Sequence, residues 1–118
     1  MRHILVADDE PHMARVLQQV LERAGYAVQI TRNGLEALEA VRVRQPDILI
    51  TDIHMPVMTG QTLCETLATE LPERTFPIYV MTSMTDRVHR QWTTDIAGIT
   101  LLEKPLSTRV LVQKFKTY

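Results

Sequence analysis

The sequence of 118 residues has little or none of several features that define whole classes of protein. Its one cysteine, Cys64, excludes an internal disulfide and a cysteine-only zinc site, and it fits a reducing compartment. No apolar run approaches the roughly 20 residues of a membrane span, and the first run ends too soon for a signal peptide. The 13 Lys and Arg residues do not exceed the 14 Asp and Glu residues, which argues against nucleic acid as the main partner. We therefore expect a cytoplasmic protein that has no membrane segment and does not bind nucleic acid directly.

Short apolar runs alternate along the chain with longer helical patterns. The runs predict five strands, at Ile4–Ala7, Ala27–Ile30, Ile48–Ile50, Ile78–Met81 and Ile99–Leu102. Apolar residues three and four apart predict helices between and after them, within Met13–Ala24, Leu35–Val41, Leu63–Leu71, Val88–Ile96 and Leu111–Phe115. Because the first, third and fourth runs are continuously apolar, we expect strands that are covered on both faces. This alternation predicts an α/β fold with a doubly wound, five-stranded parallel sheet, formed by one domain of residues 1–118.

Charged and hydroxyl side chains follow four of the predicted strands, where open α/β sheets place their ligands. Asp8 and Asp9 follow the first strand, Asp52 the third, Thr82 the fourth and Lys104 the fifth. If the strand order is 2-1-3-4-5, the first and third strands are neighbours, about 4.8 Å apart, and the three carboxylates converge. Three carboxylates so close repel one another, and a bound Mg²⁺ ion resolves this repulsion.

This arrangement favours phosphoryl transfer. Asp52 would attack phosphorus and become an aspartyl phosphate. Asp9 and Asp52 would hold Mg²⁺, with Asp8 acting mainly through water, while Lys104 and Thr82 would each hold a phosphoryl oxygen.

The same positions resemble the receiver domain of two-component response regulators, the family of the chemotaxis response regulator, over about residues 2–117. The resemblance is carried by Asp8-Asp9, Asp52, Met55-Pro56, Gly60, Thr82 and Lys104-Pro105. It implies the flavodoxin-like (βα)5 fold with strand order 2-1-3-4-5, Asp52 as phosphoacceptor, and a sensor histidine kinase or a histidine phosphotransfer protein as donor. It also implies Mg²⁺ (with Mn²⁺ as a substitute), metal ligation by the main-chain carbonyl of His54, and a cis Lys104–Pro105 bond.

The resemblance further implies how such a module signals. Phosphorylation would change the surface of helix 4, strand 5 and helix 5, which would contact an output domain or protein target and could mediate a dimer. The module would catalyse only its own phosphorylation and dephosphorylation, and so would not be an enzyme. The basic end of the chain, with Lys114 and Lys116, leaves open a fragment of a longer protein with an output domain.

Four positions bear on how far the resemblance extends. Leu101 occupies the place of the usual Tyr or Phe, so a switch that depends on an aromatic rotamer is in question. Thr59 replaces the usual Asp but can still cap a helix. His54 and Met84, each two residues after a site residue, would flank the path of water to the phosphoryl group, and we expect His54 to control its lifetime more strongly.

Other interpretations remain open from the sequence. Leu101 favours a receiver-like domain that serves as a constitutive binding surface, without phosphorylation. An aspartate-nucleophile phosphatase would need an aspartate where His54 stands. In a flavin mononucleotide carrier, Asp8-Asp9-Glu10 would repel the phosphate of the flavin. Asp8 and Asp9 are also suited to capping a helix. Three further expectations concern single positions: Trp92 suits either core or interface, Cys64 is expected to be a small buried hydrophobe, and His12 with Asp9 is a weak candidate for a transition metal.

Overall fold

The computed structural model describes residues 1–83 and 91–116. Ten elements alternate along this part of the chain: β1 (His3–Ala7), α1 (Pro11–Arg23), β2 (Ala27–Thr31), α2 (Gly34–Val43), β3 (Ile48–Asp52), α3 (Gly60–Glu70), β4 (Ile78–Thr82), α4 (Gln91–Asp95), β5 (Ile99–Glu103) and α5 (Thr108–Phe115). All five predicted strands and all five predicted helices are present. The predictions for Met84 and Val88 lie outside the described residues.

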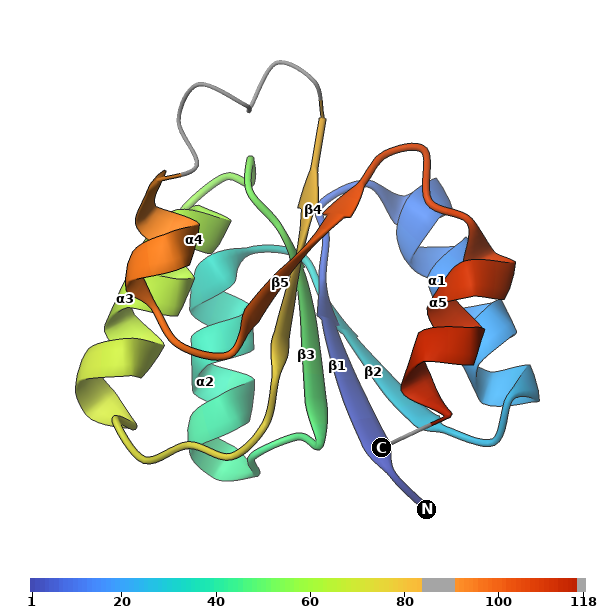
Figure 1. Ribbon diagram of the computed structural model, residues 1–118, viewed down its shortest axis with the longest axis horizontal. Helices are drawn as coiled ribbons and strands as arrows, with labels where there is room; N and C mark the ends of the chain where they lie inside the picture. Colours follow the sequence, from blue (N-terminus) through green and yellow to red (C-terminus); the bar gives the residue numbers. More distant parts are fainter. Residues whose placement is uncertain (84–90, 117–118) are drawn as a thin grey trace.

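The strands form one parallel sheet in the order β2-β1-β3-β4-β5, which confirms the predicted flavodoxin-like α/β fold. Helices α2, α3 and α4 lie on one side of the sheet, and α1 and α5 lie on the other (Figure 1). The carboxyl ends of the strands therefore share one edge, which is where the predicted site residues stand.

The two faces of the sheet carry separate hydrophobic cores. Along β1, Leu5 and Ala7 pack with residues of α2 and α3, whereas Ile4 and Val6 pack with residues of α1 and α5. All residues of β1, β3 and β4 are buried. This burial on both sides is the reason that Ile4–Ala7, Ile48–Ile50 and Ile78–Met81 are apolar without interruption.

Local signals in the sequence set several helix ends. The Asn33 side chain accepts a hydrogen bond from the Glu36 amide at 2.8 Å, and Thr59 accepts one from Thr62 at 3.2 Å. These contacts satisfy amides that the helices leave unpaired, and they confirm that Thr59 caps α3 in place of the usual Asp. Gly25, with φ of +100°, follows the end of α1 in a conformation that glycine adopts without strain.

Other predictions about packing are settled by the coordinates. Trp92 is 8% exposed and belongs to the core beneath α2 and α3, so it is not an exposed anchor in this structure. Cys64 is fully buried, and burial raises the pKa of its thiol to about 12, as befits a structural residue. Leu35, the first residue of the apolar pattern within Leu35–Val41, is 37% exposed, whereas Ala37, Leu38 and Val41 belong to the buried face of α2. None of the described helices combines the length and the apolar character needed to cross a lipid bilayer.

Candidate functional site

Three aspartates meet where β1 and β3 end. One carboxylate oxygen from each of Asp8, Asp9 and Asp52 lies within 4.8 Å of the other two. Asp8 and Asp52 are buried, while Asp9 is exposed to solvent. The convergence predicted from the strand order is therefore present, and it places negative charge in a partly enclosed volume.

Only one of the two carboxylate oxygens of Asp8 has a hydrogen-bond partner among the described residues. Its Oδ1 accepts a hydrogen bond from the Glu10 amide at 3.0 Å, whereas its buried Oδ2 has no hydrogen-bond partner among the described residues. Burial raises the pKa of Asp8; the Glu10 amide opposes this shift, and the charge of Asp52 adds to it. The N-cap position of α1 is Glu10, so the interpretation of Asp8 and Asp9 as mere helix caps is wrong.

Lys104 reaches this cluster from the end of β5. Its Nζ lies 2.8 Å from Oδ2 of Asp52, in a pair that is largely shielded from solvent. Burial alone would lower the pKa of Lys104, but the hydrogen bond and charge of Asp52 outweigh it, and the pKa is raised. The Lys104 amide also donates to the Thr82 carbonyl at 2.7 Å, and the Lys104–Pro105 bond is cis, as the resemblance implied.

Thr82 ends β4, next to the end of β3. Residue 81 on β4 pairs with Asp52 on β3, so Thr82 lies one residue beyond the Asp52 register. The Thr82 side chain is fully buried, and its Oγ1 has no hydrogen-bond partner in the described part of the chain. A buried hydroxyl without a partner costs free energy, which an acceptor oxygen placed beside it would recover.

The loop from Ile53 to Thr59 closes the site after β3. The Ile53 amide donates to Asp52 Oδ1 at 2.7 Å, which orients the carboxylate. The Gly60 amide donates to the Ile53 carbonyl at 2.8 Å, and a Cβ at Gly60 would collide with the Asp52 carbonyl oxygen. Only glycine therefore lets α3 begin this close to Asp52. His54 is exposed on the same loop.

The donor set fits a hard divalent cation. The cluster offers carboxylate oxygens alone, including a buried oxygen that lacks a partner, and such ligands suit Mg²⁺. Among the described residues, the group of candidate ligands does not extend to His12, so nothing supports the alternative of a transition metal at His12 and Asp9.

Comparisons with known proteins agree with this geometry. Residues 4–116 match the family model described as the response regulator receiver domain. The chain belongs to the response regulator receiver family. Receiver domains are signalling domains, and they generally bind Mg²⁺ at an acidic pocket such as the one formed here by Asp8, Asp9 and Asp52.

Two curated relatives are longer than this chain. The alkaline phosphatase synthesis transcriptional regulatory protein PhoP of Bacillus subtilis is 30% identical over 115 residues, which cover 98% of this chain and 47% of PhoP. The protein-glutamate methylesterase/protein-glutamine glutaminase 3 of Hahella chejuensis is 35% identical over 106 residues, covering 86% of this chain and 30% of that protein. The chain thus spans about half the length of one relative and less than a third of the other.

Solved structures show the same fold over nearly the whole chain. The chemotaxis response regulator CheY4 of Vibrio cholerae superposes with a TM-score of 0.88 at 26% identity, covering 99% of this chain and 98% of CheY4. The receiver domain of a signal transduction histidine kinase from Syntrophus aciditrophicus gives 0.89 at 31% identity, covering 99% of this chain and 89% of that one.

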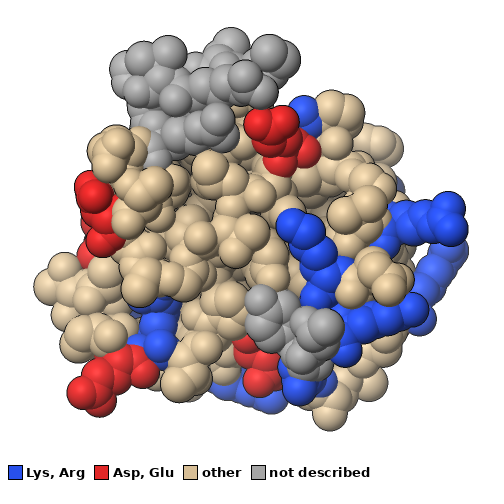
Figure 2. Space-filling model, in the orientation of Figure 1, with Lys and Arg blue, Asp and Glu red and all other residues tan. Residues whose placement is uncertain are grey.

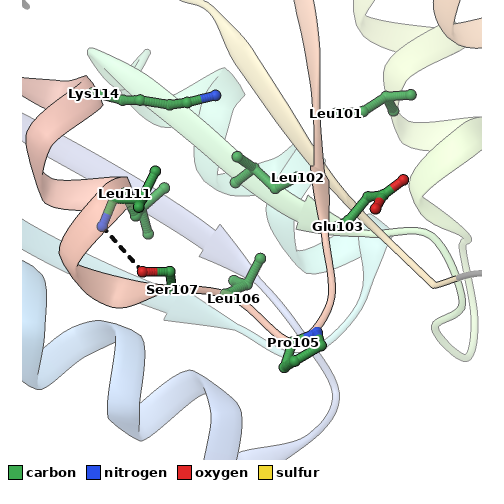
Figure 3. A pocket seen from close by; sticks show the side chains of 9 residues that line it. Leu101, Leu102, Glu103, Pro105, Leu106, Ser107, Leu111 and Lys114 are labelled. Atoms are coloured by element: carbon green, nitrogen blue, oxygen red, sulfur yellow. Dashed lines mark hydrogen bonds between the residues drawn. The ribbon is translucent and has the colours of Figure 1, made fainter.

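Leu101 and Leu102 extend from opposite faces of β5. Leu101, half-buried, packs against the core on the side of α4, and Leu102 packs against the core on the side of α5. Figure 3 shows the two side chains diverging, with Leu102 turned toward Leu111 of α5. The position of the usual aromatic residue is therefore filled by a side chain that contributes packing and no hydrogen bond.

Proposed function

We propose that residues 1–118 form one receiver domain that accepts a phosphoryl group on Asp52 from a sensor histidine kinase or a histidine phosphotransfer protein. The observation that carries this proposal is the placement of Lys104 Nζ 2.8 Å from Asp52, beside a second and a third carboxylate and a buried Thr82 hydroxyl without a partner. A nucleophile, a cation site and two donors for phosphoryl oxygens are the groups that phosphoryl transfer needs.

The transfer is a nucleophilic displacement at phosphorus. A carboxylate oxygen of Asp52 forms the new P–O bond, the P–N bond of the donor phosphohistidine breaks, and the departing imidazole keeps the electron pair and takes up a proton. Before transfer, Lys104 neutralises Asp52 and is itself placed within reach of the incoming group. Lys104 then holds one phosphoryl oxygen, and Thr82 donates its hydroxyl to another.

In this proposal Asp9 and Asp52 ligate Mg²⁺, or Mn²⁺ in its place, together with the main-chain carbonyl of His54, while Asp8 acts mainly through water. When bound, the metal neutralises the charge between the carboxylates and the phosphoryl oxygens. The buried Oδ2 of Asp8, which has no partner among the described residues, supports this assignment because a metal-bound water would satisfy it.

The signalling surface in this proposal comprises α4, β5 and α5. A pocket of about 250 Å³ lies between β5 and α5, and its lining includes Leu102, Leu106 and Leu111 (Figure 3). In the first turn of α5 the Leu111 amide donates to the Ser107 carbonyl at 3.0 Å (Figure 3). Lys and Arg side chains gather over the side on which α1 and α5 lie (Figure 2), which favours an acidic partner surface. The occupant would be an output domain, a protein target or a second copy.

The proposal is tested by incubating the protein with acetyl phosphate and Mg²⁺ and measuring the intact mass. A single phosphoryl adduct in the wild type, absent from Asp52→Asn and from samples with EDTA, is the expected result. Absence of any adduct would favour the constitutive binding surface that Leu101 suggested. Steady release of phosphate from a foreign ester would favour the phosphatase.

The lifetime of the adduct tests the role of His54. His54 is exposed two residues after Asp52, where an imidazole would orient water toward phosphorus. We expect His54→Ala to lose its phosphoryl group more slowly than the wild type. Equal decay rates would remove His54 from the proposal.

A further inference from the structure

The loop between β3 and α3 accepts backbone hydrogen bonds from two glycines. At the α3 end, the Gly60 amide donates to the Ile53 carbonyl at 2.8 Å. Directly before Thr59, the N-cap of α3, the Met58 carbonyl accepts a hydrogen bond of 2.9 Å from the amide of Gly34, the first residue of α2. The N-terminus of a helix that carries no predicted site residue thus contacts the loop that carries His54.

Gly34 fits against this loop with no space to spare. A Cβ at residue 34 would lie 2.6 Å from the Met58 carbonyl oxygen and 2.8 Å from its Cγ. The nearest atom is backbone, so a rotamer change cannot relieve the overlap. To reach an ordinary contact, the loop would have to move by about 0.8 Å.

The loop depends on this contact because its own conformation is strained. Val57 has φ of +67°, and the Met58 amide donates to the Pro56 carbonyl at 2.7 Å, which makes a tight γ-turn. A β-branched residue disfavours this region, and the Val57 side chain is 77% exposed, so its own packing contributes little. The contacts with Gly34 and Gly60 therefore hold the turn in place.

We infer that Gly34 is a positioning residue of the phosphorylation site: by fixing Met58 it fixes the loop that orients the Asp52 carboxylate and presents the His54 carbonyl. This inference rests on the proposed function, because the loop matters for metal and phosphoryl binding only if Asp52 is the phosphoacceptor. Gly34 acts through Met58 and touches neither the metal nor the phosphoryl group.

The test compares Gly34→Ala with Gly25→Ala. Gly25 has a positive φ, of +100°, so alanine there strains the backbone, but a Cβ at Gly25 meets no atom within 4 Å. It lies in the α1–β2 turn, at the edge of the sheet opposite the site. Gly25→Ala therefore controls for a general loss of stability.

Two measurements are made, one without metal and one with Mg²⁺ alone. Without metal, hydrogen exchange at the amides of Ile53 and Gly60 should be faster in Gly34→Ala than in the wild type, while exchange within β3 stays unchanged; Gly25→Ala should not accelerate exchange at Ile53 and Gly60. Titration with Mg²⁺ should show about 10–100-fold weaker binding in Gly34→Ala, the range typical of changes behind a metal ligand, and unchanged binding in Gly25→Ala.

A second variant keeps the inference testable if Gly34→Ala does not fold. Met58→Ala leaves the hydrogen bond from Gly34 but removes a half-buried side chain that packs beside it, so we expect a smaller loss of Mg²⁺ affinity. Wild-type exchange and wild-type affinity in the folded variants would overturn the role of Gly34 and leave the proposed function standing. A wild type that binds no Mg²⁺ would overturn the proposed function, and the exchange rates would still decide whether Gly34 holds the loop.

Discussion

Replacing Asp8 with Asn should stabilise the metal-free protein and weaken its response to Mg²⁺. Asp8 is buried with Oδ2 unpaired among the described residues, and it faces two further carboxylates whose oxygens lie within 4.8 Å. Asparagine has nearly the same shape, and its Oδ1 can still accept the hydrogen bond from Glu10. Its amide group replaces the unpaired oxygen with a donor that neighbouring carboxylates can accept.

The size of the effect follows from the distances. Two unit charges 4.8 Å apart repel by about 3.5 kcal/mol at an effective dielectric constant near 20. Solvent around the exposed Asp9 and the positive charge of Lys104 both reduce this repulsion, so we expect Asp8→Asn to raise the free energy of unfolding by about 1–2 kcal/mol in EDTA. At a Mg²⁺ concentration 100 times its Kd, the wild type should gain about 2.7 kcal/mol, and a variant that binds tenfold more weakly should gain about 1.4 kcal/mol.

Urea unfolding in EDTA and in Mg²⁺ measures both the free energy of unfolding without metal and its increase when Mg²⁺ is added. The variant should have the larger free energy of unfolding without metal and the smaller increase on adding it. Glu22→Gln, which removes an exposed carboxylate near the far end of α1, is the matched control. It should change neither the free energy of unfolding in EDTA nor its increase with Mg²⁺ appreciably. If Asp8→Asn is no more stable than the wild type in EDTA, the repulsion assigned to Asp8 is wrong, and if Mg²⁺ stabilises both proteins equally, Asp8 does not contribute to the cation site.

Three further changes give separable outcomes. Lys104→Met should lower the free energy of unfolding in EDTA by about 1–3 kcal/mol, because it leaves a buried carboxylate without its charged partner, and should slow phosphorylation by acetyl phosphate; unchanged rates would contradict its role. Thr82→Val should leave metal-free stability equal or higher, since it removes a buried hydroxyl with no partner in the described chain, yet reduce the yield of phosphoryl adduct. Burial lowers the pKa of His3; the Arg44 charge adds to this shift, and the Asp47 charge opposes it. The His3 imidazole therefore binds a proton more tightly in the unfolded chain than in the folded protein. Stability should then fall as pH drops below 6.5 in the wild type and fall less in His3→Gln; parallel urea midpoints between pH 7.5 and 5.5 would refute this.

The fold was predictable because the runs of apolar residues indicate which strands are buried on both faces. Ile4–Ala7 and Ile78–Met81 are apolar at every position, as strands covered on both faces must be. The site followed from the same reasoning, since parallel strands bring their carboxyl ends to one edge. Asp8, Asp52 and Lys104 then had to meet, although they are far apart in sequence.

The contacts behind the site were not predictable in this way. Gly34 is compatible with any helix N-terminus, and only the folded chain reveals that Met58 fills the space beside it. Val57 gives no sign in the sequence of its positive φ, because β-branched residues favour extended backbone. Such features depend on tertiary contacts, which override local preference.

If Asp52 is phosphorylated as proposed, Leu101 limits how the change can reach the surface formed by α4, β5 and α5. Lys104 and Thr82 are joined by a backbone hydrogen bond of 2.7 Å, so a group held by both side chains bears on β4 and β5 together. Leu101, three residues earlier on β5, packs against the core that includes Trp92 and has no group that can hydrogen-bond to Thr82. We expect any signal that reaches α4 through Leu101 to be one of volume and packing. Leu101→Tyr should therefore change which surface the phosphorylated protein presents without changing the rate at which Asp52 is phosphorylated, and a changed rate would show that Leu101 bears on the chemistry itself.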